Sequence, residues 1–222
     1  MGLERKKGII VNKINYDEFD MIISLLTNKG VLNFLAKGIR KPNSKNSTNL
    51  NIFSIVECEI FLARLDGKIS KLKKAIAIKN FDYTNKYNLS INDDLFFIFK
   101  NTEYINSDFL QKYELFLSNI GDNKTNFWLS WLYANSIMIK PIIPAYNHCH
   151  ICNSNQNLQY FCWHDGGMVC ENHTNNKTSE KQLWQYYYLF TNVHKYIENC
   201  TIYDNIRILK EIKIFLNNNG YY

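Results

Sequence analysis

The sequence has no apolar run long enough to cross a membrane. A membrane-spanning helix needs about 20 consecutive apolar residues, whereas the short run at residues 96–99 is followed directly by Lys100 and Asn101. The basic N-terminus leads into only a brief apolar stretch, without the small-residue cleavage site of an export signal. We therefore expect a protein that is neither exported nor bound to membranes and that lies in the cytoplasm.

The short motifs that mark several large enzyme classes are also missing. There is no G-x-x-x-x-G-K-[ST] loop for nucleotide phosphates, no G-x-S-x-G nucleophile turn and no H-E-x-x-H metal pair. The combination of H-x-E with P-C-x-x-C, which a zinc deaminase requires, is absent as well. We therefore expect that the protein is not an enzyme.

Positive charge is present, and it is concentrated near the N-terminus. Residues 1–80 contain 15 Lys and Arg against 7 Asp and Glu, a balance of +8, whereas residues 81–222 contain 11 against 13, a balance of −2. Abundant Asn, Lys and Ile with only four arginines suggest an AT-rich genome, but such a bias would raise lysine in both parts. The asymmetry predicts an anionic partner for the N-terminal part.

The basic residues of this part are candidate contacts to a phosphate backbone, which supplies most of the affinity for nucleic acids. They form three clusters: Arg5, Lys6, Lys7 and Lys13; Lys37, Arg40, Lys41 and Lys45; and Arg64, Lys68, Lys71, Lys73 and Lys74. A solvated surface position is the alternative for any one of them. Aromatic residues that could stack on bases are few here, so we predict backbone-dominated binding with weak sequence preference.

Residues 1–80 have the pattern of five β-strands, at about 7–14, 19–26, 31–36, 52–62 and 69–78. Hairpin turns are indicated at residues 28–30 and 66–67, and the polar segment 40–47 is too long for a hairpin. A long connection after the third strand favours an OB-type β-barrel. A sandwich fragment or an SH3-like barrel is the alternative.

The remainder, residues 81–222, is predicted to form a helical domain. Apolar residues recur at helical spacing over about 107–120, 125–139 and 206–216, and in a further helix that begins at Ser179. Ser107 is a predicted N-cap, and Ser179 with Gln182 resembles a capping box. The predicted fold class is therefore α+β, with a barrel domain at 1–80 and a helical domain at 81–222.

A pattern of metal ligands interrupts the helical part. Cys149, Cys152, Cys170 and His173 form C-x2-C-x17-C-x2-H, and the glycines at 166 and 167 allow the insert to fold as a hairpin. Such pairs are typical of a closed structural zinc site. We predict a zinc knuckle at about 146–175 that holds one zinc ion per chain. Four neighbouring side chains are alternative ligands, namely Cys162, His164, His148 and His150; ordinary buried thiols beside a surface histidine are the alternative to a metal site.

Several segments together resemble the RecO family of DNA repair and recombination mediators. They are residues 8–11 (GIIV), 16–20 (YDEFD), 24–27 (SLLT), 35–42 (LAKGIRKP) and 53–57 (FSIVE), of which the A-K-G-x-R-K segment followed by F-S-x-x-E is the most specific. The Cys-x2-Cys knuckle and the order of barrel and helices agree with that family, so the resemblance covers nearly the whole chain. One departure is His173, because family members with this module usually present four cysteines.

The resemblance implies a protein that binds single- and double-stranded DNA without sequence preference and anneals complementary strands. It also implies help in loading the recombinase RecA onto DNA coated by single-stranded-DNA-binding protein, in the cytoplasm and associated with the nucleoid. The implied partners are DNA, RecR, often RecF, and the acidic C-terminal tail of the coating protein. Lys37, Arg40 and Lys41 are the first choices for DNA contacts. An interaction scaffold and an RNA-binding OB protein are the alternatives.

Overall fold

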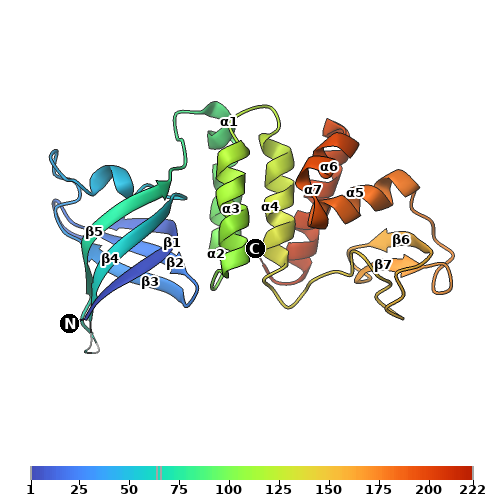
Figure 1. The fold of residues 1–222 in the computed structure, drawn as a ribbon, viewed down its shortest axis with the longest axis horizontal. Helices are drawn as coiled ribbons and strands as arrows, with labels where there is room; N and C mark the ends of the chain where they lie inside the picture. The colour runs from blue at the N-terminus through green and yellow to red at the C-terminus, as the bar shows by residue number, and fades with distance from the viewer. Residues whose placement is uncertain (1, 64, 66, 222) are drawn as a thin grey trace. The chain divides into compact units, whose positions relative to one another are not determined.

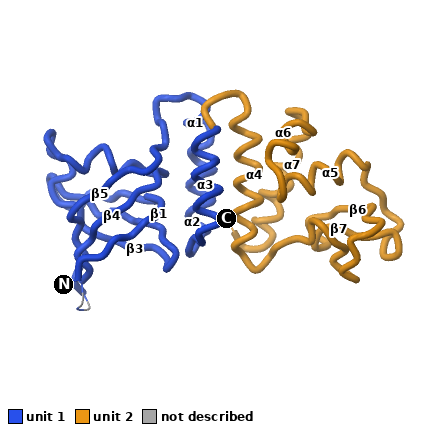
Figure 2. The backbone as a smooth tube through the Cα atoms, viewed as in Figure 1, with its two compact units in different colours: residues 1–119 blue, residues 120–222 orange. Residues whose placement is uncertain are grey.

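The computed structural model of the chain describes residues 2–63, 65 and 67–221 (Figure 1). They divide into two compact units, residues 1–119 and residues 120–222 (Figure 2). The first unit therefore includes three helices in addition to the N-terminal barrel, whose last strand ends at Lys79. The division into a barrel domain at 1–80 and a helical domain at 81–222 stays a prediction. Among the described residues, no helix is long and apolar enough to cross a membrane.

Five strands form a closed barrel in the first unit, in the order β1-β2-β3-β5-β4. The pairing of β3 with β5 is parallel and the other pairings are antiparallel. This arrangement confirms the predicted OB-type barrel. The strands are β1 (Gly2–Asn15), β2 (Met21–Thr27), β3 (Gly30–Ala36), β4 (Ile55–Leu62) and β5 (Ser70–Lys79).

Strand β1 closes the barrel by pairing with two neighbours. Its first half pairs with β4 and its second half with β2, and Gly8 lies where the strand passes from one to the other. A Cβ atom on Gly8 would lie 2.2 Å from the carbonyl oxygen of Leu26, so only glycine permits this close approach. Buried apolar side chains, such as Ile10, Ile23 and Phe34, fill the interior.

The long connection after β3 protects an edge of β5. Strand β3 pairs only with the first two residues of β5, Ser70 and Lys71. The later backbone groups of β5 therefore have no strand partner on that side. Asn46 Oδ1 accepts from the Ala75 backbone N–H at 3.0 Å, and Asn49 Oδ1 accepts from Ala77 at 3.3 Å. These asparagines, at the short 3-10 turn η1 (Ser47–Asn49), take the place of a sixth strand.

Helices α1 (Lys86–Leu89), α2 (Asn92–Lys100) and α3 (Ser107–Asn119) complete the first unit. Aromatic side chains connect them to the barrel: the Phe53 ring contacts Phe96 and Phe99, and the Tyr113 hydroxyl donates to the Phe53 carbonyl at 2.7 Å. The predicted helix at 107–120 is confirmed. Its predicted cap was wrong, because the side chain that accepts from the Phe109 N–H is Asn106, at 2.7 Å.

The second unit is built around helix α4 (Thr125–Ile137), whose residues from Phe127 to Ile137 are all buried. A helix that is apolar on all sides lies inside a protein, and α4 packs against three later helices. They are α5 (Glu180–Thr191), α6 (Val193–Asn199) and α7 (Ile202–Asn218). The hairpin of β6 (Leu158–Cys162) and β7 (Gly167–Cys170) precedes α5 and contacts it, as Figure 1 shows.

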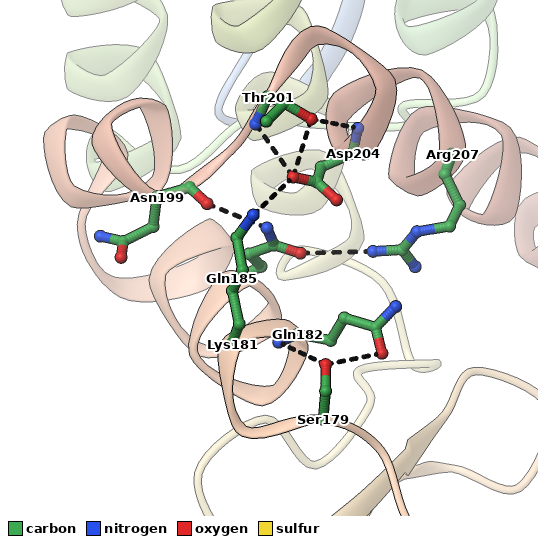
Figure 3. Close-up of polar contacts among 8 residues, drawn as sticks. All are labelled: Ser179, Lys181, Gln182, Gln185, Asn199, Thr201, Asp204 and Arg207. Carbon is green, nitrogen blue, oxygen red and sulfur yellow. Dashed lines mark hydrogen bonds and ion pairs between the residues drawn. The ribbon is translucent and has the colours of Figure 1, made fainter.

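A polar network joins α5 to the two helices that follow it (Figure 3). Gln185 Nε2 donates to the Asn199 carbonyl at 2.9 Å, and Arg207 Nη2 donates to Gln185 Oε1 at 3.3 Å. The Asp204 carboxylate accepts from the Thr201 backbone N–H at 3.0 Å and pairs with Lys181 at 3.3 Å. Asp204 therefore both caps α7 and ties it to α5.

This network predicts a loss of stability in acid. Burial acts to raise the pKa of Asp204, but hydrogen bonds from Thr201, Lys181 and Gln185 outweigh it and lower the pKa from 3.8 to about 2. A carboxylate with a depressed pKa stabilises the fold fully above its unfolded-state pKa, and that contribution is lost as the pH falls from about 4 to about 2. The free energy of unfolding, measured with urea at several pH values, should therefore fall more steeply between about pH 4 and about pH 2 in the wild type than in Asp204→Asn. Equal slopes would contradict this role of Asp204.

Candidate nucleic-acid interface and metal centre

A groove with a volume of about 810 Å³ lies on the barrel. It runs between the β1–β2 loop, the end of β3 and the β4–β5 hairpin. We call it the barrel groove, and its lining consists of Tyr16, Asp17, Asp20, Leu35, Lys37, Ala63, Leu65, Gly67, Lys68, Ile69 and Lys71. OB barrels bind oligonucleotides on the β2–β3 face and the loops that join β1 to β2 and β4 to β5. The groove lies at that position.

Three of the predicted basic residues line the barrel groove with exposed side chains, Lys37, Lys68 and Lys71. No carboxylate of the described residues lies within ion-pair distance of their ammonium groups. Asp20, which also lines the groove, accepts from the Gly38 backbone N–H at 2.7 Å. It thereby fixes the exit of β3. Asp17 is the second carboxylate of the lining and accepts from the Glu18 backbone N–H at 2.7 Å. Both carboxylates are thus engaged by backbone donors, and among the described residues the three lysines have no ion-pair partner.

Arg40 and Lys41 lie beside the barrel groove and hold one of its walls. The Arg40 guanidinium donates to the carbonyl of Asp17, and the Lys41 ammonium lies 5.5 Å from the centre of the Phe19 ring. Both contacts fix the β1–β2 loop against the segment that follows β3. Both side chains are exposed, so their charge adds to that of the groove although neither lines it.

The other predicted DNA contacts are dispersed. Four of them pair with carboxylates, namely Arg5 and Lys73 with Glu59 at 3.1 Å each, Lys6 with Glu4 at 2.5 Å and Lys7 with Glu114 at 3.9 Å. Lys13 is half-buried, and desolvation lowers its pKa. Lys45 and Lys74 are exposed away from the groove, and Arg64 lies outside the described residues. The structure thus brings together only one part of the predicted basic set.

Leu65 lines the groove and had no predicted role. Leu65 is 70% exposed in the β4–β5 hairpin, and Tyr16, on the opposite loop, is 60% exposed. An apolar residue within a polar turn was the signal that could have drawn attention to Leu65. Large exposed apolar side chains beside three lysines make the groove suitable for bases as well as phosphates.

The four predicted metal ligands converge in the second unit. The ligand atoms of Cys149, Cys152, Cys170 and His173 all lie within 4.8 Å of one another. The Sγ atoms of Cys152 and Cys170 are 3.8 Å apart, and His173 Nδ1 lies 3.2 Å from the sulfur of Cys170 and 3.7 Å from that of Cys149. A tetrahedral zinc ion with its usual bond lengths separates two sulfurs by about 3.8 Å and a sulfur from a nitrogen by about 3.6 Å. The cluster fits such an ion.

Tight turns of the backbone present each pair of ligands. The Asn153 N–H donates to the Cys149 carbonyl at 2.8 Å, and the His173 N–H donates to the Cys170 carbonyl at 3.0 Å. Between the two ligand pairs, the β6–β7 hairpin brings Cys170 back beside the first pair, as predicted for this segment. Gly167 packs so closely on Ala145 that a Cβ would lie 2.2 Å from the Ala145 carbonyl oxygen. The glycine therefore fixes the position of β7 and its Cys170.

The backbone also favours an ionised sulfur at Cys149. Desolvation acts to raise the pKa of this thiol, but the backbone N–H groups of Cys170, Cys152 and Ile151 outweigh it and lower the pKa to about 5. The thiolate is the form that binds metal. Cys149 and Cys170 are buried, whereas Cys152 and His173 are exposed, so one side of the cluster faces solvent.

The alternative ligands lie elsewhere in the hairpin region. Cys162 and His164 line a different hollow, together with Trp163. His148 Nδ1 donates to Asn147 Oδ1 at 2.8 Å, and the His150 ring lies against Gly166. The group of four that the structure assembles is the one predicted from the outer pairs. That this group binds one metal ion, and that the ion is zinc, stays a prediction.

These features define a class of protein in which an OB-type barrel with a cationic groove precedes a helical unit with a Cys3His cluster. The family model for the N-terminal part of recombination protein O matches residues 1–81. The chain is 30% identical over 188 residues to DNA repair protein RecO of Mesoplasma florum, covering 78% of this chain and 68% of that protein. It is 26% identical over 189 residues to DNA repair protein RecO of Mycoplasma mycoides, covering 77% and 76%. The chain therefore belongs to the RecO family.

Proposed function

We propose that the protein is a nonenzymatic mediator of DNA repair and recombination. It binds single- and double-stranded DNA without sequence preference, anneals complementary strands and helps load RecA onto DNA coated by single-stranded-DNA-binding protein. The observation that carries the proposal is the barrel groove, because Lys37, Lys68 and Lys71 line it at the position where OB barrels take up oligonucleotides. Family membership supports the same role, since the relatives are named DNA repair proteins.

Annealing requires no bond to be broken, so it needs no catalytic residue. Two complementary strands repel each other through their phosphates, and a surface that supplies cations and displaces counterions lowers this barrier. The groove lysines would contact phosphates, while Tyr16 and Leu65 offer apolar surface to bases. Contacts of this kind do not depend on sequence.

The proposal includes partners and a structural metal. The partners are RecR, often RecF, and the acidic C-terminal tail of the coating protein, and the protein acts in the cytoplasm on DNA of the nucleoid. Cys149, Cys152, Cys170 and His173 would hold one zinc ion per chain. With four protein ligands no coordination position is left for a reacting water, so the ion would stabilise the second unit and take no part in the reaction with DNA.

An annealing assay with complementary labelled oligonucleotides tests the proposal. We expect the protein to accelerate annealing of bare strands and of strands coated by the single-stranded-DNA-binding protein. A protein that binds its partners but does not accelerate annealing would instead be an interaction scaffold. Tighter binding to RNA than to DNA of equal length would favour an RNA-binding role. Either result would overturn the proposed function.

A further inference from the structure

Another hollow lies within the second unit between the β6–β7 hairpin and α5, distinct from the barrel groove and from the hollow lined by Cys162. Its volume is about 640 Å³. We call it the aromatic pocket, and its characteristic lining residues are Tyr146, Trp184, Tyr187, Asn147, Asn155 and Glu180. We propose that this pocket binds an unpaired nucleobase of single-stranded DNA. The inference rests on the proposed function and adds to it a site that recognises single strands.

The pocket presents aromatic rings that are already fixed in position. Trp184 is 46% exposed, and its indole stacks on Tyr188 with ring centres 5.4 Å apart and an angle of 21°. The indole N–H donates to Glu180 at 3.4 Å, one helical turn earlier on α5. Across the pocket, Tyr146 stacks on Phe190 with centres 4.9 Å apart. Rings held in this way offer a stacking surface at little cost in side-chain entropy.

Polar groups at the edge of the pocket suit the edges of a base. The Asn155 amide makes no hydrogen bond within the part of the chain that the structure describes, and only the oxygen of the Asn147 amide is engaged, by His148. An amide side chain offers both a donor and an acceptor, and a carboxylate such as Glu180 accepts from a base N–H, either an exocyclic amino group or the ring N–H of thymine. No lysine or arginine of the described residues lines the pocket. Its chemistry therefore matches a base and not a phosphate.

The helix that carries Trp184 is rigidly anchored. The network of Figure 3 ties Lys181 to Asp204 and Gln185 to Arg207, which holds α5 against α6 and α7. A cation is also nearby, since the Lys195 ammonium lies 5.4 Å from the centre of the Tyr188 ring. A strand whose base stacks on Trp184 would have a positive charge close to its backbone.

Fluorescence tests this directly, because Trp184 is the exposed tryptophan. Trp128, Trp131 and Trp163 are 3%, 5% and 8% exposed, so a ligand that stacks on Trp184 changes the emission of one known residue. We expect oligo(dT) to quench this emission and duplex DNA of equal length to leave it unchanged. Trp184→Ala should lower the affinity for oligo(dT) about 10-fold, as for the loss of one stacked base, and leave duplex affinity unchanged.

Controls separate this inference from the proposed function. Tyr203→Ala removes an aromatic ring that is 85% exposed on α7 and should leave both affinities unchanged. Trp184→Phe should retain most of the oligo(dT) affinity, because it retains a ring. If Trp184→Ala binds oligo(dT) with the same affinity as the wild type, the assignment of the pocket is wrong and the proposed function is unaffected. If the wild type binds no DNA, both are wrong. A Trp184→Ala variant that keeps its DNA affinity but no longer binds a peptide of the coating protein's tail would assign the pocket to protein and overturn the inference.

Discussion

Replacing Lys37, Lys68 and Lys71 together with alanine is expected to lower the affinity for single-stranded DNA about 100-fold at about 0.1 M salt. Each phosphate contact on a single strand contributes about 0.7 to the slope of log K against log salt, so three contacts contribute about 2. The slope should fall by that amount. Fluorescence anisotropy of a labelled oligonucleotide at several salt concentrations measures both quantities.

A matched variant controls for the change in net charge. Lys124, Lys177 and Lys210 are exposed lysines of the second unit and lie outside the barrel groove. Replacing these three with alanine removes the same charge and should change the slope by less than about 1. If both triple variants lose the same affinity, net charge and not the groove determines binding, and the assignment of the groove is wrong.

Replacing Cys149 with serine is expected to remove the metal and lower the melting temperature. Structural zinc contributes roughly 10 to 16 kcal/mol in isolated fingers. The helices of the second unit reduce that dependence, but a loss of about 4 kcal/mol would still lower the melting temperature by about 10 °C in a chain of this size. Elemental analysis of the purified wild type should give one zinc per chain, and thermal unfolding should show the shift.

The matched control is Cys162→Ser, in the same hairpin. Cys162 lies outside the group of four ligands and lines a different hollow. This variant should therefore retain its metal and its melting temperature. Metal loss in Cys162→Ser, together with retention in Cys149→Ser, would show that the ligand set is wrong. A wild type that contains no zinc while its cysteines are reduced would reject the zinc site itself.

Local patterns were sufficient to predict the barrel and the metal cluster. Alternation and turn residues indicate each strand, and the hairpin glycines with two ligand pairs at two-residue spacing restrict how the metal module can fold. Helices α1, α2 and α6 were not predicted. They are 4, 9 and 7 residues long, too short for apolar periodicity to identify them, and their packing contributes most of their stability.

The charge pattern predicted an anion-binding surface in the N-terminal part but could not show which of the basic residues form it. All the basic clusters look equivalent in the sequence, because the sequence does not show which lysines form ion pairs with carboxylates that are distant in the chain but close in the fold. Glu59 neutralises Arg5 and Lys73 from another strand, 54 residues after Arg5 in the chain. The barrel groove is formed by segments that are separate in the sequence, and so is the aromatic pocket around Trp184. In the sequence alone, Trp184 and Tyr187 have the spacing of residues that pack in a helix core.

The most direct test of the account is the salt dependence of DNA annealing by the wild-type protein, compared with the variant that lacks Lys37, Lys68 and Lys71. The account predicts that the wild type accelerates annealing of complementary strands, that acceleration falls steeply between about 50 and about 200 mM salt, and that the variant has lost most of it at every salt concentration. Annealing that is independent of salt, or equal in wild type and variant, would contradict the account.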